Sequence, residues 1–229
     1  MTDEETDMAV HHRLVRQLIE RGRIAPPADL ASELRLDRSE LKASFLRLAS
    51  SHSLVLHPHS DEPWVIHPFS LSPTHTWVAR GEGGWWAPCL WCGFGIANLV
   101  GGDVTIHCRI GGEAEAVQIL VRNGEPAETG LWAHFPERPA LAWNNVHHFC
   151  ARLLPFRLQN DVGVWAERHG FALGQVLPVS QLADLARRWY GRHADPFWRK
   201  ATVEEASEIF TAAGLTGEFW QLAPRPGAF

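Results

Sequence analysis

The sequence lacks any long apolar run and any apolar segment near its start of the kind that directs secretion. A helix that spans a membrane needs about 20 consecutive apolar residues, and no run in the chain approaches that length. The first residues, MTDEETDM, are acidic and carry no apolar signal core. We therefore expect a cytoplasmic protein with no membrane partner.

The sequence also lacks an excess of positive charge. Its 21 Lys and Arg residues are outnumbered by 26 Asp and Glu residues, which gives a formal net charge of -5. This balance argues against a general binder of polyanions, although it leaves room for a local basic patch. With 229 residues, 45% of them hydrophobic, the chain is long enough for one large globular domain or two small ones.

Cysteine is scarce, with four in the whole chain. Because the cytoplasm keeps thiols reduced, we expect metal ligands, chemical groups or core residues here rather than disulfides. Two of the four, Cys89 and Cys92, lie in the stretch APCLWC, directly after the pair Trp85-Trp86. Tryptophan, by contrast, is abundant, and the 11 tryptophans predict an aromatic core and aromatic-lined cavities.

The first third of the chain predicts three helices followed by a hairpin. Apolar residues recur at helical spacing in residues 10–21, 26–34 and 37–50. The third of these segments opens with Asp and has Glu three residues later, the pattern of a capping box. Two short strand-like stretches follow, LVLHPHS and DEPWVIH. This order predicts a winged helix-turn-helix-like domain within residues 1–75.

The third predicted helix would be the recognition helix if this domain bound DNA. It carries Arg38, Lys42 and Arg47, but Asp37 and Glu40 lie beside them. A DNA reader shows a clearer basic face, because neutralising phosphates supplies most of the affinity. We therefore expect this domain to pack on the rest of the protein as a lid or scaffold and not to bind DNA.

The remainder predicts a mixed α/β domain over residues 76–229, so the expected fold class is α+β. Residues 69–84 are rich in Pro and Gly and predict a linker. The expected strands are residues 104–108, 117–121, 131–135 and 151–158. The expected helices are residues 87–99, 162–169 and 179–190, and a last helix from Thr202 to about Gly214. The chain from about residue 195 onward is read as a helical extension.

The spacing of Cys89 and Cys92 is compatible with a zinc site, a redox pair or a thiol pocket. A structural zinc site would need a second close pair of ligands, whereas Cys108 and Cys150 stand singly. A thioredoxin-like pair follows a strand in a βαβ unit, which the pattern does not supply. In a helix beginning at Pro88, Cys89 would lie in the first turn, where a thiolate is favoured. Cys92 would face the same side, and two such thiols can chelate a soft cation.

The layout around these cysteines resembles the alkylmercury lyases, also called organomercurial lyases. In that family a catalytic Cys is followed three residues later by Asp, on a helix that ends in Leu-(Ile/Val)-Gly. Cys89, Cys92 and the run 99–101, LVG, have this spacing without a gap. The family's second catalytic Cys follows a Phe and precedes a Trp-Ala pair, as Phe149-Cys150 and Trp165-Ala166 do here.

The fourth cysteine fits the same resemblance, which spans roughly residues 10 to 190. Cys108 falls close to a structurally important cysteine of the family, and its alternation with Val104 and Ile106 predicts a buried strand residue. The resemblance implies an N-terminal winged-helix-like domain and a C-terminal mixed α/β catalytic domain. It does not cover the C-terminal extension, for which the sequence suggests no role.

The resemblance implies protonolysis of a carbon–mercury bond, with release of R–H and Hg(II). Cys89 and Cys150 are the expected binding thiols, and Cys89 is the expected site of first capture because of its helix position. Cys92 stands where the family has its proton-handling Asp, so we expect it to deliver the proton or to act as a third ligand. No cofactor is expected, and Hg(II), or another soft metal, would rest on the thiolates only transiently.

The remaining expectations concern the pocket, the partners and the alternatives. Trp85, Trp86, Trp91 and Phe149 are candidates for an apolar pocket around the R group. The resemblance implies a small organometallic substrate, and mercury-accepting thiols or a downstream reductase as partners. Without the Asp, the same thiols would also suit a soft-metal or thiol-reactive binding protein. A metal-responsive winged-helix regulator is a third alternative, and it would require DNA binding.

Overall fold

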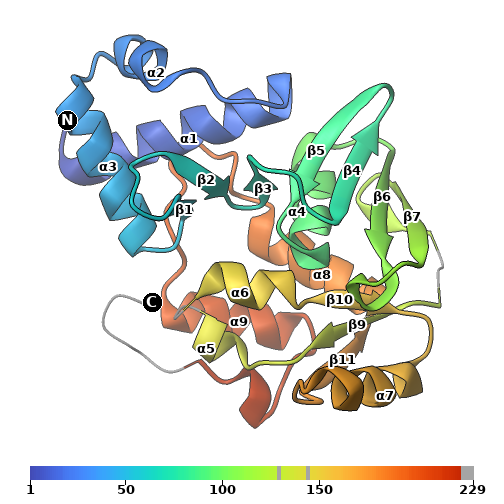
Figure 1. The fold of residues 1–229 in the computed structure, drawn as a ribbon. Helices are drawn as coiled ribbons and strands as arrows, with labels where there is room; N and C mark the ends of the chain where they lie inside the picture. Colours follow the sequence, from blue (N-terminus) through green and yellow to red (C-terminus); the bar gives the residue numbers. More distant parts are fainter. Residues whose placement is uncertain (128–129, 143–144, 223–229) are drawn as a thin grey trace.

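The computed structural model describes residues 1–127, 130–142 and 145–222. They form a mixed α+β fold with an eight-stranded and a three-stranded antiparallel sheet, so the predicted fold class is confirmed (Figure 1). Across these ranges, no helix combines the length and the apolar character that crossing a membrane would take.

Three helices open the chain: α1 (Asp3–Arg21), α2 (Pro27–Leu34) and α3 (Arg38–Ser50). Both α1 and α3 begin with a capping box, in which Thr2 or Asp37 accepts from the backbone of the Glu three residues on. These boxes satisfy backbone N–H groups that lack partners at a helix start. The helices and the following strand pair, β1 (Leu54–Leu56) and β2 (Pro63–Ile66), appear in the predicted order, while the winged-helix interpretation remains a prediction.

The large sheet continues from that strand pair directly into the rest of the protein. Its strand order is β1-β2-β3-β5-β4-β6-β7-β8, and every neighbouring pair is antiparallel. The strands are β1 (Leu54–Leu56), β2 (Pro63–Ile66), β3 (Phe69–Ser70), β4 (Thr76–Arg80), β5 (Gly83–Ala87), β6 (Val104–Arg109), β7 (Ala116–Arg122) and β8 (Glu125–Pro126).

The linker prediction for residues 69–84 is wrong, because β3, β4 and the start of β5 lie there. The glycines of this stretch serve a tight hairpin instead of a flexible connection. Gly81 has a φ of 58° in the turn, a conformation that glycine adopts without strain. A Cβ on Gly84 would lie 2.2 Å from the carbonyl oxygen of Val78, so only glycine allows the strands to approach this closely.

A buried helix, α4 (Leu90–Val100), lies between the large sheet and α8 (Val179–Tyr190) (Figure 1). The helix begins three residues later than predicted, because Ala87 still pairs with Thr76 in the sheet. Residues Leu90 to Ala97 are all buried, so the apolar character of this helix reflects packing on both sides. α8 has the predicted bounds.

The rest of the chain forms the second sheet and several short helices. Its strands are β9 (Trp132–Phe135), β10 (Leu154–Phe156) and β11 (Gln175–Pro178), in the order β10-β9-β11. The other helices are α5 (Pro139–Ala142), α6 (Val146–Ala151), α7 (Gln159–His169) and α9 (Val203–Ala212), with short 3-10 turns at Ile110–Gly112 and Glu218–Trp220. The predicted strand at 151–158 is shorter than expected, and its first residue closes α6. The predicted capping box of Thr202 and Glu205 at the start of α9 is confirmed.

Candidate active site

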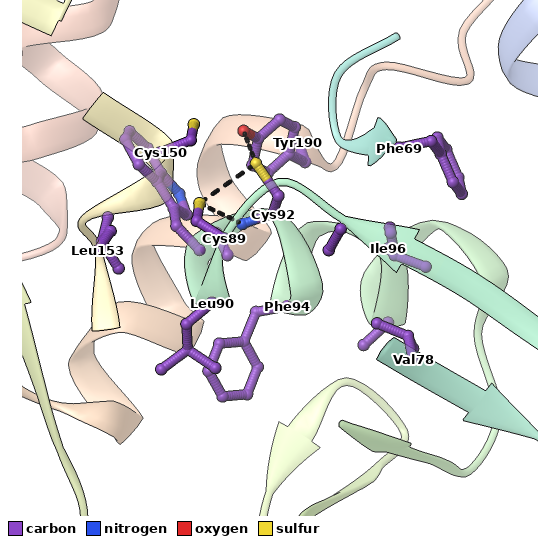
Figure 2. Packing of buried hydrophobic residues seen from close by; sticks show 14 of the residues in the cluster. Phe69, Val78, Cys89, Leu90, Cys92, Phe94, Ile96, Cys150, Leu153 and Tyr190 are labelled. Atoms are coloured by element: carbon purple, nitrogen blue, oxygen red, sulfur yellow. Dashed lines mark hydrogen bonds between the residues drawn. The ribbon is translucent and has the colours of Figure 1, made fainter. Parts of the chain in front are cut away.

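Three cysteines that are distant in sequence meet beside the start of α4. The sulfur atoms of Cys89, Cys92 and Cys150 all lie within 4.8 Å of one another, and those of Cys89 and Cys92 are 3.4 Å apart (Figure 2). All three are free thiols. Within the described ranges, this is the one group of three or more His, Cys, Asp or Glu side chains placed to share a metal ion. Thiols so arranged suit a soft cation.

Cys89 caps the helix that it precedes. Its backbone is extended, and its sulfur accepts a hydrogen bond from the backbone N–H of Cys92 at 3.4 Å. Cys89 is therefore the N-cap residue of α4. The sequence predicted it one position further on, within the first turn of the helix. Burial alone raises the pKa of its thiol, but hydrogen bonds from Cys150 and Cys92 and from that N–H hold the pKa well below its usual range. Of the three thiols, Cys89 is the one whose surroundings favour the thiolate.

The pKa values of the other two cysteines of the cluster are raised. Burial and the neighbouring Cys89 sulfur raise the pKa of Cys92 well above its usual range. Hydrogen bonds with Cys89 and Cys92, together with burial, do the same for Cys150. These surroundings favour a single thiolate, at Cys89, beside two protonated thiols, because a second negative charge in so buried a space is unfavourable.

Two further polar groups contact Cys92, and the sequence reasoning identified neither. The hydroxyl oxygen of Tyr190, the last residue of α8, lies 3.3 Å from the Cys92 sulfur (Figure 2). Nδ1 of His67 lies 4.0 Å from the same sulfur. Tyr190 is the single tyrosine of the chain and ends an amphipathic segment, which is a signal of a buried polar group. His67 carries no comparable signal.

Both groups are neutral near pH 7. Burial lowers the pKa of His67 to about 4, so its imidazole is uncharged. Burial and the nearby thiol charges raise the pKa of Tyr190 well above its usual range, so its hydroxyl stays protonated. The Tyr190 hydroxyl can therefore donate a hydrogen bond to the Cys92 thiol or accept one from it, and the tautomer of His67 decides whether Nδ1 donates or accepts.

A cavity of about 540 Å³ reaches the cluster from the side of Cys150. Cys150, His67 and Tyr190 line it, whereas Cys89 and Cys92 are fully buried behind them. Trp91 and Phe149, two of the predicted pocket residues, line the same cavity. The volume falls in the usual range for small-molecule sites.

The structure places Trp85 and Trp86, the other two predicted pocket residues, away from this cavity. The indole N–H of Trp85 donates to the carbonyl oxygen of Leu18 at 2.6 Å, so this side chain ties β5 to α1. Trp86 is 36% exposed and packs against Trp77 of the neighbouring strand. Both border a separate hollow beside Leu18.

Cys108 does not join the cluster. It lies in β6 with 3% of its surface exposed, so the predicted inward orientation is confirmed. Burial raises the pKa of its thiol to about 12, which makes it unreactive at neutral pH.

Comparison with known proteins shows which family the chain belongs to. The family model described as "Alkylmercury lyase" matches residues 69–191, more than half of the chain. The chain belongs to the alkylmercury lyase family. All three clustered cysteines and Tyr190 fall inside the matched range.

A solved structure and the curated proteins were also compared with this alkylmercury lyase family member. The structure titled "Crystal structure of the mercury-bound form of MerB2" is similar, with a TM-score of 0.61, 19% sequence identity, and coverage of 86% of this chain and 99% of that chain. At this identity the similarity supports the fold alone. Among curated proteins, no match was found.

The cavity extends beyond the part of the chain that the alkylmercury lyase model matches. Phe197, Trp198, Ile209 and Ala212 all follow residue 191 and line its far wall. Trp198 stacks on His11 of α1 with ring centroids 3.9 Å apart. The C-terminal extension is therefore one wall of the candidate site, a role that the sequence did not suggest.

Proposed function

We propose that this protein cleaves the carbon–mercury bond of organomercurials by protonolysis. The observation that carries the proposal is the cluster of three thiols within 4.8 Å, in which one thiol has a lowered pKa and two have raised pKa values. A thiolate binds Hg(II) strongly, and a protonated thiol beside it is a proton source. The two requirements of protonolysis thus lie side by side.

The first step is capture of R–Hg–X by the Cys89 thiolate. The sulfur forms a bond to mercury, and the group X leaves as an anion. Because the Cys89 sulfur lies behind Cys150, the substrate approaches past Cys150 from the cavity. The N–H of Cys92 and the start of α4 favour the thiolate before capture.

The second step transfers a proton from a neighbouring thiol to carbon. In the adduct Cys89–S–Hg–R, the thiol of Cys92 gives its proton to R while its sulfur bonds to mercury. The Hg–C bond breaks, R–H leaves, and mercury remains as Cys89–S–Hg–S–Cys92. Atoms and charges balance without a carboxylate, because one thiol supplies both the proton and the new ligand. Cys150 is the third ligand, and it can make the same transfer.

The cycle closes when small thiols, or a reductase acting downstream, remove Hg(II) from the cysteines. Mercury is substrate and product here, so the reaction requires no resident cofactor. The aromatic side chains of Trp91 and Phe149 beside Cys150 suit an apolar R group. We propose small organomercurials, aryl compounds included, as the substrates.

A second candidate function is a soft-metal binding protein built on the same fold. It is favoured by the presence of a third thiol, Cys92, where the family has an acid. Three thiolates can hold a soft ion so firmly that release becomes slow. In that case the protein would capture mercury and retain it.

A turnover assay distinguishes the two functions. The reduced protein is incubated with phenylmercury acetate and excess thiol, and benzene is followed by gas chromatography. Benzene formed over many turnovers, lost in Cys89→Ser and kept in the control Cys108→Ala, establishes the lyase. Protein-bound mercury without benzene establishes the binding protein instead. Cys108 is a matched control because it is a buried cysteine outside the cluster.

A further inference from the structure

Tyr190 reaches the thiol cluster from the opposite helix. Its hydroxyl oxygen lies 3.3 Å from the Cys92 sulfur, and only 4% of the residue is exposed. The contact joins the end of α8 to the start of α4 (Figure 2). A buried phenol finds a hydrogen-bond partner in most proteins, and here that partner is a sulfur at the centre of the candidate site.

The ring of Tyr190 packs directly against α4 at Gly95. A Cβ on Gly95 would lie 2.3 Å from Cδ2 of Tyr190, so the ring fits there only because residue 95 is glycine. The ring also packs edge-on against Trp91, with centroids 6.1 Å apart, and against His193, with centroids 4.9 Å apart. Because Gly95 and Cys92 lie one turn apart on the same helix, one element fixes both the ring and the sulfur.

The Cys92 sulfur lies between two partners, the Cys89 sulfur at 3.4 Å and the Tyr190 hydroxyl oxygen at 3.3 Å. In the arrangement that suits proton transfer, the S–H of Cys92 is directed to the Cys89 sulfur and the phenol O–H donates to the Cys92 sulfur. The three groups form a chain of donors that ends at the thiolate, and such chains strengthen each member.

We propose that Tyr190 is a positioning residue for the proton step. Its O–H orients the Cys92 thiol toward Cys89 and holds the thiolate that Cys92 becomes when its proton moves to carbon. Tyr190 keeps its own proton throughout, so the balance of the reaction does not change. This inference rests on the function proposed above and assigns to Tyr190 a part of the support that the Asp provides elsewhere in the family.

The first test separates capture from cleavage in Tyr190→Phe, which keeps the ring and removes the hydroxyl. Capture of one phenylmercury per protein should be unchanged, while release of benzene in a single turnover slows roughly 10-fold to 100-fold, the usual effect of losing a hydrogen bond to a charged group. Trp165→Phe is the control, because it removes an indole hydrogen bond to Gly111 in a separate buried cluster. Equal cleavage rates in Tyr190→Phe and the unaltered protein would overturn the inference and leave the proposed function standing.

The second test needs neither turnover nor a substitution at Tyr190. Because the chain has a single tyrosine, labelling with tyrosine enriched in carbon-13 at Cζ gives one resonance, whose shift reports on the hydroxyl hydrogen bond. The resonance should move in Cys92→Ala and stay in place in Cys108→Ala. A resonance that does not shift in Cys92→Ala would contradict the contact between Tyr190 and Cys92. Absence of benzene from the unaltered protein, by contrast, would refute the lyase proposal and the proton step together.

Discussion

The sulfurs of Cys89 and Cys92 lie 3.4 Å apart, yet the pKa of one thiol is lowered and that of the other is raised. The asymmetry arises because hydrogen bonds with the Cys150 and Cys92 thiols, and the Cys92 N–H at the start of α4, all lower the pKa of Cys89. In the proposed reaction this difference makes Cys89 the nucleophile and Cys92 the acid. Catalytic carboxylate pairs share a proton for the same electrostatic reason.

This division predicts a bell-shaped pH dependence for benzene release in a single turnover. The lowered pKa of Cys89 keeps capture active below the ordinary thiol pKa of about 8.5, and capture is lost only as pH falls through the lowered value. Cleavage is lost at the alkaline end, as pH rises through the raised pKa of Cys92 or Cys150 and the proton source disappears. Because the pKa values of Cys92 and Cys150 are raised above that of an ordinary thiol, the alkaline limb is expected above about pH 9, and rates measured from about pH 5 to about pH 11 test both limbs. A rate that does not fall at the alkaline end would argue against a protonated thiol as the proton source.

Cys92→Asp restores the family's residue and tests the need for a third thiol. We expect single-turnover cleavage to be retained, because a buried carboxyl keeps a raised pKa and can donate a proton. Transfer of Hg(II) to an external dithiol should become faster, since two thiolates hold the ion less firmly than three. Both steps are read by benzene release and by mercury transfer to a chromogenic dithiol. If Cys92→Asp lost cleavage while Cys92→Ser kept it, a carboxyl group at residue 92 would not be able to serve as the proton donor.

The thiol cluster was predictable from sequence because its parts carry local signals. The spacing of Cys89 and Cys92, and the Phe before Cys150, pointed to these three residues through their resemblance to the motifs of the alkylmercury lyases. Their convergence depends on α4 and α6 meeting in space, which no spacing specifies. The two strands expected at residues 104–108 and 117–121 are confirmed as β6 and β7, because their strict alternation of buried residues is a local signal.

The errors have equally local causes. Glycines in residues 69–84 were read as flexibility, whereas Gly84 is required by the close approach of two strands. Trp85 and Trp86 were assigned to the pocket because they lie near Cys89 in sequence, but Trp85 is bonded to Leu18 of α1 and Trp86 packs on Trp77. Tyr190 was missed although it ends an amphipathic segment, whereas the contact of His67 with Cys92 leaves no pattern in a single sequence.

Gly95→Ala tests whether α4 is shaped to receive Tyr190. The added methyl would meet the ring at 2.3 Å, so we expect the free energy of unfolding to fall by about 1 to 3 kcal/mol, the usual cost of overpacking. Gly163→Ala in α7 is the control, because nothing lies within 4 Å of its new Cβ. The free energy of unfolding of Gly163→Ala should rise by up to about 1 kcal/mol, because alanine has the higher helix propensity. Denaturant unfolding measures both, and equal stability of the two variants would mean that the ring moves aside at little cost.

The C-terminal wall predicts a selective effect on bulky substrates. Trp198 lines the cavity and stacks on His11 at 3.9 Å, so Trp198→Ala opens the far wall without touching the thiols. We expect KM for phenylmercury to rise several-fold, because an aryl group loses an aromatic contact, while kcat/KM for methylmercury changes little. Leu173→Ala, at an exposed position that is not among the cavity-lining residues, is the control. If both substrates lose activity in parallel in Trp198→Ala, the wall supports the fold and does not select among R groups.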